Sequence, residues 1–589
     1  MKRCPECGRE YDNTMMFCLD DGAELLYGPA RSEPGAIATG FPSDEPQTAI
    51  LHSTSAPGEA PTRAQINLTG QTAILNTGAE AEPQGSLGGV SEKQSFSANR
   101  AAKPLIGVLA AVIILVGGFF AYRYFSPAKQ INSIAVMPFE NRNSDADTDY
   151  LSDGLAESLI FRLTQIPDLR VSPTSSVMRY KGKETDIAKI ASELGVDAVM
   201  TGRLTKRGDN LNITVELVDA RTNKSLWGEQ YERKLSELLT TQREIVAEIV
   251  GKLQLKLSGE SEQKLAKKYT DNNEAYQLYL KGRFHFAKRT KEDILKGIEY
   301  FQQAIKLDPN FALAYASIAE SYNAIPSYPY LSSKEASPQA KAAATRALEI
   351  DPNLSEAHSA LGAYLGNYEW NWTEAEREHK RAIELSPNSS IAHFRYGQHL
   401  STLGRKDESI AEVKRAVYLE PLSLITGANL AGTYLNAGQK EMGLEQAKKI
   451  YDLEPNFIGG RFWLGASYNA NGMYAETIAI GEESLKSDPK NQLMLFVAGY
   501  AYAKSGRRQE AEEIVKRFRE IEKTQYVSSC FIASIYGALG EKDKAFAELE
   551  KALQNRDWEL SRLKVAPSWE PLRDDPRYKD LLKRMGLPE

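Results

Sequence analysis

The sequence predicts a multidomain protein: a right-handed α-solenoid of helical hairpins preceded by a small α/β domain, one transmembrane helix and a short metal-binding segment. Three observations predict this fold class. Prolines recur at a nearly constant interval in the C-terminal half, residues 104–122 form an uncharged apolar run, and three of the four cysteines lie close together at the N-terminal end. A chain of 589 residues is also too long for one domain.

The overall composition is that of an ordinary globular protein. Charged residues make up 25% of the chain, hydrophobic residues make up 42%, and the formal net charge is -6. Nucleic acid and anionic lipid surfaces attract basic proteins, and this chain has no excess of positive charge. We therefore expect no nucleic-acid partner.

The N-terminal segment, residues 1–26, carries a candidate metal site. Cys4 and Cys7 form one closely spaced pair, and Cys18 and Asp21 repeat the same spacing further along. Such pairs can converge on one tetrahedral ion, and three thiolates with one carboxylate suit Zn²⁺. The pattern resembles a zinc ribbon, in which the fourth ligand would be Cys and not Asp21. A redox-active Cys-x-x-Cys pair and a metal-free segment remain as alternatives.

A linker and one membrane span are expected next. Residues 27–102 are rich in Gly, Ala, Pro, Ser, Thr and Gln without a sustained apolar period, which predicts disorder. Residues 104–122 contain no charge and are just long enough to cross a hydrocarbon core. The basic residues around the run favour a cytoplasmic N-terminus only weakly, and a thiolate site favours the same orientation. We expect a single-pass protein of the inner (cytoplasmic) membrane, with the residues after 125 periplasmic or extracellular.

Residues 131–258 are expected to form a small α/β domain. The apolar run Ser133–Phe139 predicts a buried strand, and the following apolar positions recur at helical spacing. Alternation of Leu211, Ile213, Val215 and Leu217 next to Gly208-Asp209 predicts a β-hairpin. In order, we expect a strand at 133–139, a helix at 150–163, a strand at 169–175, a helix at 187–194, strands at 197–206, 210–220 and 224–232, and a helix at 236–257.

Residues 273–556 show the repeat that decides the architecture. Acid-proline or serine-proline pairs end at Pro309, Pro352, Pro387, Pro421, Pro455 and Pro489. The first interval is longer and the later ones are nearly equal, at about 34 residues, which is the period of tetratricopeptide repeats. Small residues recur in phase where paired helices must approach closely, at Gly397, Ala431 and Gly465, with Gly362 one residue out of phase. About eight hairpins are expected to stack into a right-handed superhelix, with residues 557–589 capping the last one.

Residues 133–256 resemble the TolB amino-terminal-like domain of bacterial proteins that carry tetratricopeptide arrays. The resemblance rests on Ser133–Phe139, Tyr150–Gly154, Ile190–Asp197 and Leu226–Tyr231. In relatives of this layout the cytoplasmic end is often a kinase, a DNA-binding domain or a nucleotide cyclase. The residues before the span contain no Gly-rich phosphate loop and no kinase motif.

The concave inner wall is the expected partner site. In the family this wall is formed by positions on the first helix of each hairpin, and Asn there can donate to and accept from an extended peptide. A solvated helix face is the alternative interpretation. Mapped by phase, the candidates are Asn367, Gln398, Asn436, Asn469, Tyr500 and Lys504.

The sequence therefore predicts a membrane-anchored scaffold of the bacterial envelope, without enzymatic activity, that binds a protein or peptide in the concave face. The alternative is a transmembrane receptor whose outer domains sense a ligand and whose zinc ribbon recruits a cytoplasmic effector. A hydrolase in the α/β domain is disfavoured, because that domain has no Gly-x-Ser-x-Gly or His-Glu-x-x-His motif. His358, His379, His393 and His399 lie in two adjacent hairpins but lack the spacing of ligands on one helix face, so we expect packing or surface roles for them.

Overall fold

The computed structural model describes residues 2–3, 10–11, 131–143, 146–183, 186–255, 257–327 and 331–587. The expected zinc ligands, the linker and the apolar run 104–122 lie outside these residues. Near the N-terminus two short strands, β1 (Lys2–Arg3) and β2 (Glu10–Tyr11), pair in antiparallel fashion. No helix within the described ranges is long and apolar enough to span a membrane.

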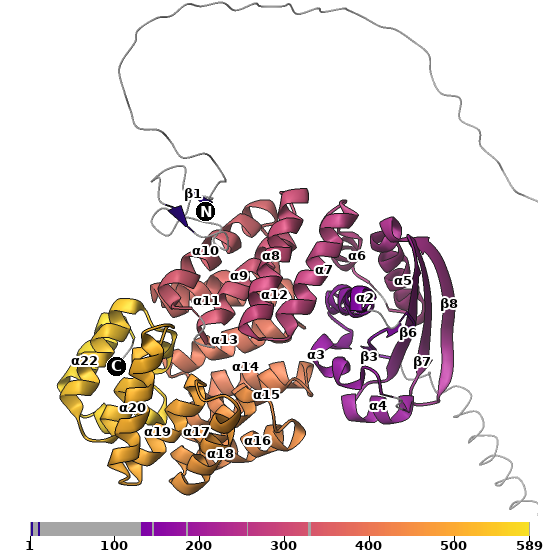
Figure 1. The fold of residues 1–589 in the computed structure, drawn as a ribbon. Coiled ribbons are helices and arrows are strands. Elements are labelled where there is room, and N and C mark those ends of the chain that lie inside the picture. The colour runs from indigo at the N-terminus through magenta and orange to yellow at the C-terminus, as the bar shows by residue number, and fades with distance from the viewer. Residues whose placement is uncertain are drawn as a thin grey trace, which may run out of the picture. The chain divides into compact units, whose positions relative to one another are not determined.

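The α/β domain contains a mixed sheet with the strand order β5-β3-β6-β7-β8 (Figure 1). Parallel pairs join β3 to β5 and β6, and β4 to β6, whereas β6, β7 and β8 form an antiparallel meander. The strands are β3 (Ser133–Val136), β4 (Glu140–Asn141), β5 (Arg170–Ser172), β6 (Ala198–Arg207), β7 (Asn210–Asp219) and β8 (Lys224–Lys234). The helices are α2 (Ala146–Thr164), α3 (Thr174–Val177), α4 (Ile187–Leu194) and α5 (Leu238–Lys252), with short 3-10 turns at η1 (Met178–Tyr180) and η2 (Leu235–Glu237).

Alternation along β7 forms part of the core of this domain. Leu211, Ile213, Val215 and Leu217 are buried on one face, and the residues between them are partly or fully exposed. The predicted hairpin is present, with Gly208 at a φ of +59° in the turn between β6 and β7. The predicted strands and helices of this domain are therefore observed in the predicted order, with small differences at their ends. The short strand β4 and the helix α3 were not predicted, and α3 begins within the range 169–175 that was predicted to be a strand.

The described part of the C-terminal region contains eight helical hairpins. In the later repeats the first helices start at a constant interval, at Ser390, Leu424, Ile458 and Gln492, and the last one starts at Ser529 after a longer turn. The pairs are α7 (Asn273–Ala287) with α8 (Lys291–Leu307), α9 (Ala312–Ala324) with α10 (Ser333–Ile350), α11 (Ser355–Tyr364) with α12 (Trp372–Leu385), α13 (Ser390–Leu403) with α14 (Lys406–Leu419), α15 (Leu424–Asn436) with α16 (Lys440–Leu453), α17 (Ile458–Ala470) with α18 (Tyr474–Ser487), α19 (Gln492–Lys504) with α20 (Arg508–Glu522), and α21 (Ser529–Ala538) with α22 (Lys542–Asn555).

Close approach of paired helices explains the small residues that recur in phase. A Cβ atom added to Gly397 would lie 2.5 Å from Val413 Cγ2, and one added to Gly362 would lie 2.9 Å from the His379 ring. Gly465 likewise approaches a side chain of the next hairpin, and Ala431 is fully buried. These residues therefore lie at tight helix crossings, as the repeat pattern predicts.

The turn inside each of the later hairpins needs a left-handed residue, and the sequence supplies glycine at the same interval. At each of these turns the residue between the two helices has a φ near +80°, and only glycine adopts this φ without steric strain. The positions are Gly404, Gly438, Gly472, Gly506 and Gly540. This regular spacing is visible in the sequence and strengthens the repeat assignment.

The α/β domain and the array belong to one compact unit, and the domain contacts the turns between hairpins. The link is α6 (Gly259–Ala266), a helix absent from our sequence prediction, together with the residues that follow it. Thr270 Oγ1 donates to Asp308, Lys267 Nζ contacts Asp351 at 2.5 Å, and Lys264 Nζ donates to the carbonyl of Leu385 at 3.3 Å. Three side chains in regular order thus contact three successive turns. Asp308 and Asp351, the acids of two of the acid-proline pairs that mark the repeat, therefore help to hold the α/β domain.

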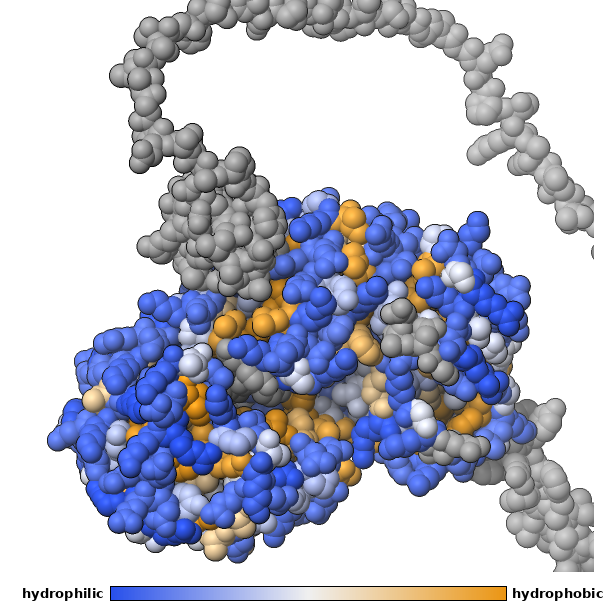
Figure 2. Space-filling view, viewed as in Figure 1, coloured by the Kyte–Doolittle hydropathy of each residue, from blue (hydrophilic) through white to orange (hydrophobic). Residues whose placement is uncertain are grey.

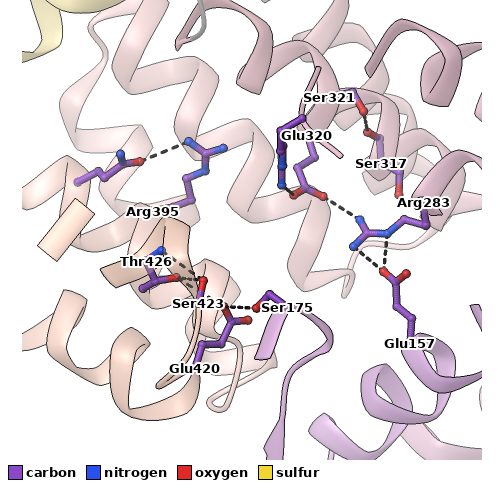
Figure 3. Close-up of polar contacts among 12 residues, drawn as sticks. Glu157, Ser175, Arg283, Ser317, Glu320, Ser321, Arg395, Glu420, Ser423 and Thr426 are labelled. Atoms are coloured by element: carbon purple, nitrogen blue, oxygen red, sulfur yellow. Dashed lines mark hydrogen bonds and ion pairs between the residues drawn. The ribbon is translucent and has the colours of Figure 1, made fainter. Parts of the chain in front are cut away.

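Polar contacts also join α2 and α3 to the array (Figure 3). Arg283 of α7 contacts Glu157 of α2 at 2.7 Å and Glu320 of α9 at 3.0 Å, and Ser175 of α3 lies 3.5 Å from Glu420 at the end of α14. Burial disfavours the charge on Arg283, but the two carboxylates outweigh it and raise the pKa of this guanidinium well above its usual value. The first hairpins therefore hold the α/β domain by paired charges.

Candidate partner-binding site

The last residues of the chain turn back over the inner side of the array. After α22 they form η5 (Trp558–Arg562), η6 (Pro567–Leu572) and α23 (Pro576–Arg584). Lys564 Nζ donates to the carbonyl of Leu403 at 3.2 Å, and Trp372 Nε1 donates to the carbonyl of Met585 at 2.9 Å. Residues 557–587, which we call the tail, therefore join the eighth hairpin to the third and fourth.

The tail is an integral part of the core. Leu560, Leu563, Trp569 and Leu572 are at most 3% exposed and pack together with the last hairpin. The repeat pattern predicts a cap on the final hairpin and a long groove along the array. The cap is present, and its buried apolar side chains fix the tail against the first helices of several hairpins, so the groove is interrupted.

A pocket of about 280 Å³ remains between the tail and the inner wall. Its walls come from α17 and α19 on one side and from residues 562–570 on the other, and Phe462, Phe496 and Val497 supply apolar surface. The face of the molecule shown in Figure 2 is largely hydrophilic, with patches of apolar residues exposed on it. A concave, partly apolar pocket with a few polar groups is the usual form of a binding site.

The structure brings three of the six predicted wall residues into this pocket. Asn469, Tyr500 and Lys504 line it. The other three, Asn367, Gln398 and Asn436, are not among its lining residues. The role of all six in partner binding stays a prediction.

Two of the residues outside the pocket have local explanations. Asn367 falls in a π-helical turn, η4 (Leu365–Glu369), which extends α11 and shifts the phase of that repeat. Gln398 Oε1 accepts a hydrogen bond from Arg395 at 3.3 Å on the same helix. The phase count therefore fails within the third hairpin, and the amide oxygen of Gln398 is already engaged on its own helix.

Asn436 and Asn469 share one bonding pattern. Asn436 Nδ2 donates to Ser401 Oγ at 3.1 Å, and Asn469 Nδ2 donates to the carbonyl of Val497 at 3.0 Å, so each amide links adjacent hairpins. The Oδ1 atom of each is buried and has no hydrogen-bond partner among the described residues. A buried acceptor without a donor costs about 1–3 kcal/mol, so these atoms are suited to receive an N–H group from outside the chain.

Arg562 is the functional candidate that the sequence analysis missed. Its guanidinium lies over the rings of Trp463 at 4.6 Å and Phe462 at 6.0 Å, and it lines the pocket. Its Nε is buried without a hydrogen-bond partner in the described ranges, and burial lowers the pKa of Arg562 to about 10. The residue lies beyond the repeats, where no period indicates its position, so only the fold shows that it faces the inner wall.

Two of the clustered histidines have the structural roles that their spacing indicates. His358 Nδ1 contacts Glu378 Oε2 at 2.5 Å while its Nε2 contacts the carbonyl of Pro352 at 3.0 Å. His393, one repeat later, makes the same two contacts with Glu412 and Pro387. Each therefore ties the turn before its helix to the second helix of its hairpin.

The predicted zinc ligands Cys4, Cys7, Cys18 and Asp21 lie outside the described residues, so their arrangement stays a prediction. Within the ranges that the structure does describe, no group of three or more His, Cys, Asp or Glu side chains could hold a metal ion.

Comparisons with known proteins match two parts of the chain. Residues 129–248 match the family model of the HilA/YgeH-like transcriptional regulator, second domain, and residues 528–556 match a tetratricopeptide repeat model. A curated relative, putative adenylate cyclase 3 from Rhizobium meliloti (strain 1021), is 32% identical over 193 residues, which are 33% of this chain and 32% of that protein. The chain thus spans about a third of the length of this relative.

Two solved structures illustrate the likeness of fold. A tetratricopeptide repeat protein from Parabacteroides merdae ATCC 43184 is 12% identical, covers 54% of this chain and 100% of its own, and gives a TM-score of 0.30. TolB from Acinetobacter baumannii is 18% identical, covers 21% of this chain and 29% of its own, and gives a TM-score of 0.16. Because both scores are low, the assignment of a tetratricopeptide-type solenoid after an α/β domain rests on the repeat model and on the contacts described above.

Proposed function

We propose that this chain is a membrane-anchored scaffold without enzymatic activity that binds a protein or peptide partner on the inner wall of its C-terminal hairpins. The observation that carries the proposal is the pair of buried acceptors, Asn436 Oδ1 and Asn469 Oδ1, which have no donor among the described residues. An extended polypeptide offers N–H groups that would satisfy such acceptors. Because the tail interrupts the groove, the partner would present a short segment or a chain end and not a long extended strand.

Membrane anchoring and zinc belong to the same proposal and are supported by sequence pattern. One span at 104–122 would place residues 1–26 in the cytoplasm, where Cys4, Cys7, Cys18 and Asp21 would hold one Zn²⁺. Residues after 125 would then lie in the periplasm or outside the cell. The relative named putative adenylate cyclase shares only a third of its length with this chain, so its name transfers no activity.

The test compares partner capture by the full chain and by a double variant. Asn436→Ala with Asn469→Ala removes both acceptors, and we expect at least a tenfold loss of a captured partner, because two unmet hydrogen bonds cost about 1.4 kcal/mol or more. Asn429→Ala is the matched control, since Asn429 Nδ2 donates within its own helix to the carbonyl of Ile425 at 2.8 Å. Equal recovery of every partner by the wild type and the double variant would contradict the wall assignment.

A second candidate, a signalling receptor, is favoured by the docking of the α/β domain on the turns of the array. Binding of a partner on the inner wall would then shift the conformation of the α/β domain, which follows the expected membrane span in the chain. Deleting residues 1–26 separates the two functions: a scaffold keeps its partners and its phenotype, whereas a receptor keeps its partners and loses its output.

A further inference from the structure

The pocket beside the tail has an imbalance of charge. Lys440, Lys504 and Arg562 contribute three basic groups, and Glu570 contributes the one carboxylate of the lining. Glu570 lies 3.8 Å from Lys440, so it pairs with only one of the three cations. Lys504 is exposed and forms no ion pair with any described residue. The pocket therefore presents a net positive surface to whatever enters it.

Arg562 is the strongest indication that an anion completes this pocket. Its side chain donates no hydrogen bond and forms no ion pair among the described residues, although stacking on Trp463 holds the guanidinium in place. The acid that acts on it, Glu559, has a pKa raised to about 7 by burial and so offers only part of a negative charge. Arginine fixed in this way loses little conformational freedom when it binds a carboxylate, and such charge-assisted bonds are the strong ones.

The rest of the lining indicates what the anion is attached to. Phe462, Phe496 and Val497 offer an apolar surface, and the volume of about 280 Å³ lies just below that of ordinary ligand pockets. Asn469 Oδ1 adds one buried acceptor that has no donor in the described part of the chain. Together these groups match a carboxylate, an apolar body and, next to it, one N–H group.

We infer that the pocket between α17, α19 and residues 562–570 binds an apolar carboxylate about the size of one amino-acid residue, with Arg562 as its anchoring cation. Two sources share this chemistry: a free acid, and the C-terminal residue of a polypeptide. The second source rests on the proposed function, because it names what the partner would insert. The first source would make the pocket a sensor for a small acid and does not need a protein partner.

The experiment measures binding of three small probes to the full chain by calorimetry. Phenylacetate has the acid and the ring, N-acetyl-phenylalanine adds the amide N–H, and N-acetyl-phenylalaninamide lacks the acid. We expect both acids to bind and the amide to bind at least tenfold more weakly, because it loses the charge-assisted bond. Binding of the amide as tight as that of N-acetyl-phenylalanine, or no binding by either acid, would overturn the inference.

Variants then identify the groups that bind. Arg562→Gln should weaken both acids at least tenfold, and Lys504→Gln, at an exposed position where little packing is lost, should weaken them about threefold. Lys516→Gln, on an exposed lysine outside the pocket that pairs with Glu513, is the control and should change nothing. Unchanged acid binding by both Arg562→Gln and Lys504→Gln would contradict the inference.

The source follows from Asn469→Ala. If the natural ligand is a polypeptide end, this variant weakens N-acetyl-phenylalanine and spares phenylacetate, because only the former has an N–H for Asn469 Oδ1. If the natural ligand is a free acid, we expect Asn469→Ala to bind N-acetyl-phenylalanine and phenylacetate as tightly as the wild type does. Failure of all probes, while the Asn436 and Asn469 double variant still loses partner capture, would sink this inference and leave the proposed function standing.

Discussion

Two arginines show how differently the two ends of the array are completed. Arg283 in the first hairpin contacts carboxylates of both the α/β domain and the second hairpin, and its pKa is raised. Arg562 in the tail stacks on Trp463, forms no ion pair among the described residues, and its pKa is lowered. At one end of the array the chain supplies carboxylates that pair with Arg283. At the other end no described carboxylate forms an ion pair with Arg562.

This difference separates an end whose polar groups are paired from an end whose polar groups are open to the proposed partner. Where the polar groups of an interface are paired, as between α2 and the first hairpins, the contacts fix the geometry. Arg562 Nε and the Oδ1 atoms of Asn436 and Asn469 are buried and have no hydrogen-bond partner among the described residues. A ligand can supply the acceptor and the donors that these groups lack. The first hairpins therefore serve as a platform for the α/β domain, and the later hairpins with the tail form the candidate site.

The largest expected difference comes from removing the two arginines. Arg283→Met leaves Glu157 and Glu320 partly buried without their shared cation and should lower the free energy of unfolding by about 3 kcal/mol. Arg562→Met breaks no ion pair and keeps an apolar stem against Trp463, so it should change stability by less than about 1 kcal/mol. Denaturant unfolding of the full chain measures both, and equal losses would remove the contrast between the two ends.

A smaller contrast is expected for two asparagines. Asn388 Nδ2 lies within hydrogen-bond distance of the carbonyls of Ile166, Pro167 and Leu169, and its Oδ1 accepts from a neighbouring arginine at 3.1 Å. Asn388→Ala should therefore cost about 2 kcal/mol and expose the 166–169 loop to proteolysis. Asn436→Ala, which loses one bond and relieves an acceptor without a donor, should cost about 1 kcal/mol or less. A larger loss for Asn436→Ala would show that its Oδ1 is not available to a ligand.

The smallest effect concerns the buried acids at the base of the tail. Ser528 Oγ lies 3.1 Å from Asp557 Oδ2 and 2.8 Å from Glu559 Oε2, and neither carboxylate forms an ion pair in the described part of the chain. Burial raises the pKa of Asp557 to about 6 and the pKa of Glu559 to about 7. A raised carboxyl pKa contributes stability that is present below the unfolded value near 4.5 and is lost as the pH rises through about 7.

Replacing Glu559 tests this pH dependence. Glu559→Gln keeps a hydrogen-bonding group beside Ser528 and cannot ionise, so it should be about 1 kcal/mol more stable than the wild type at pH 8 and no more stable at pH 5. Glu513→Gln, at an exposed position, is the control and should show no such pH dependence. A stability difference that stays constant between pH 5 and pH 8 would exclude ionisation of Glu559 as the cause.

Sequence reasoning located most of the elements and three of the eight polar side chains that line the pocket. Asn469, Tyr500 and Lys504 were found because the repeat places them at inner-wall phase, and all three line the pocket. Asn367 lies elsewhere because the π-helical turn inserts into the period just where phase is counted. Helix α6 was missed because it is short and polar, and its contacts are with turns far along the chain.

The repeat itself was determined by sequence alone, because the hairpins reuse the same local rules. A small residue lies at the helix crossing, a left-handed glycine forms the turn in the later hairpins, and a proline follows the second helix in the first six. The tertiary structure alone decided where the tail lies. Its bonds join residues as far apart as Lys564 and Leu403, or Trp372 and Met585, and no periodic pattern relates such partners. Burial of the tail's apolar side chains therefore set the size of the pocket, and the position of Arg562 added a third cation to Lys440 and Lys504 of the repeats.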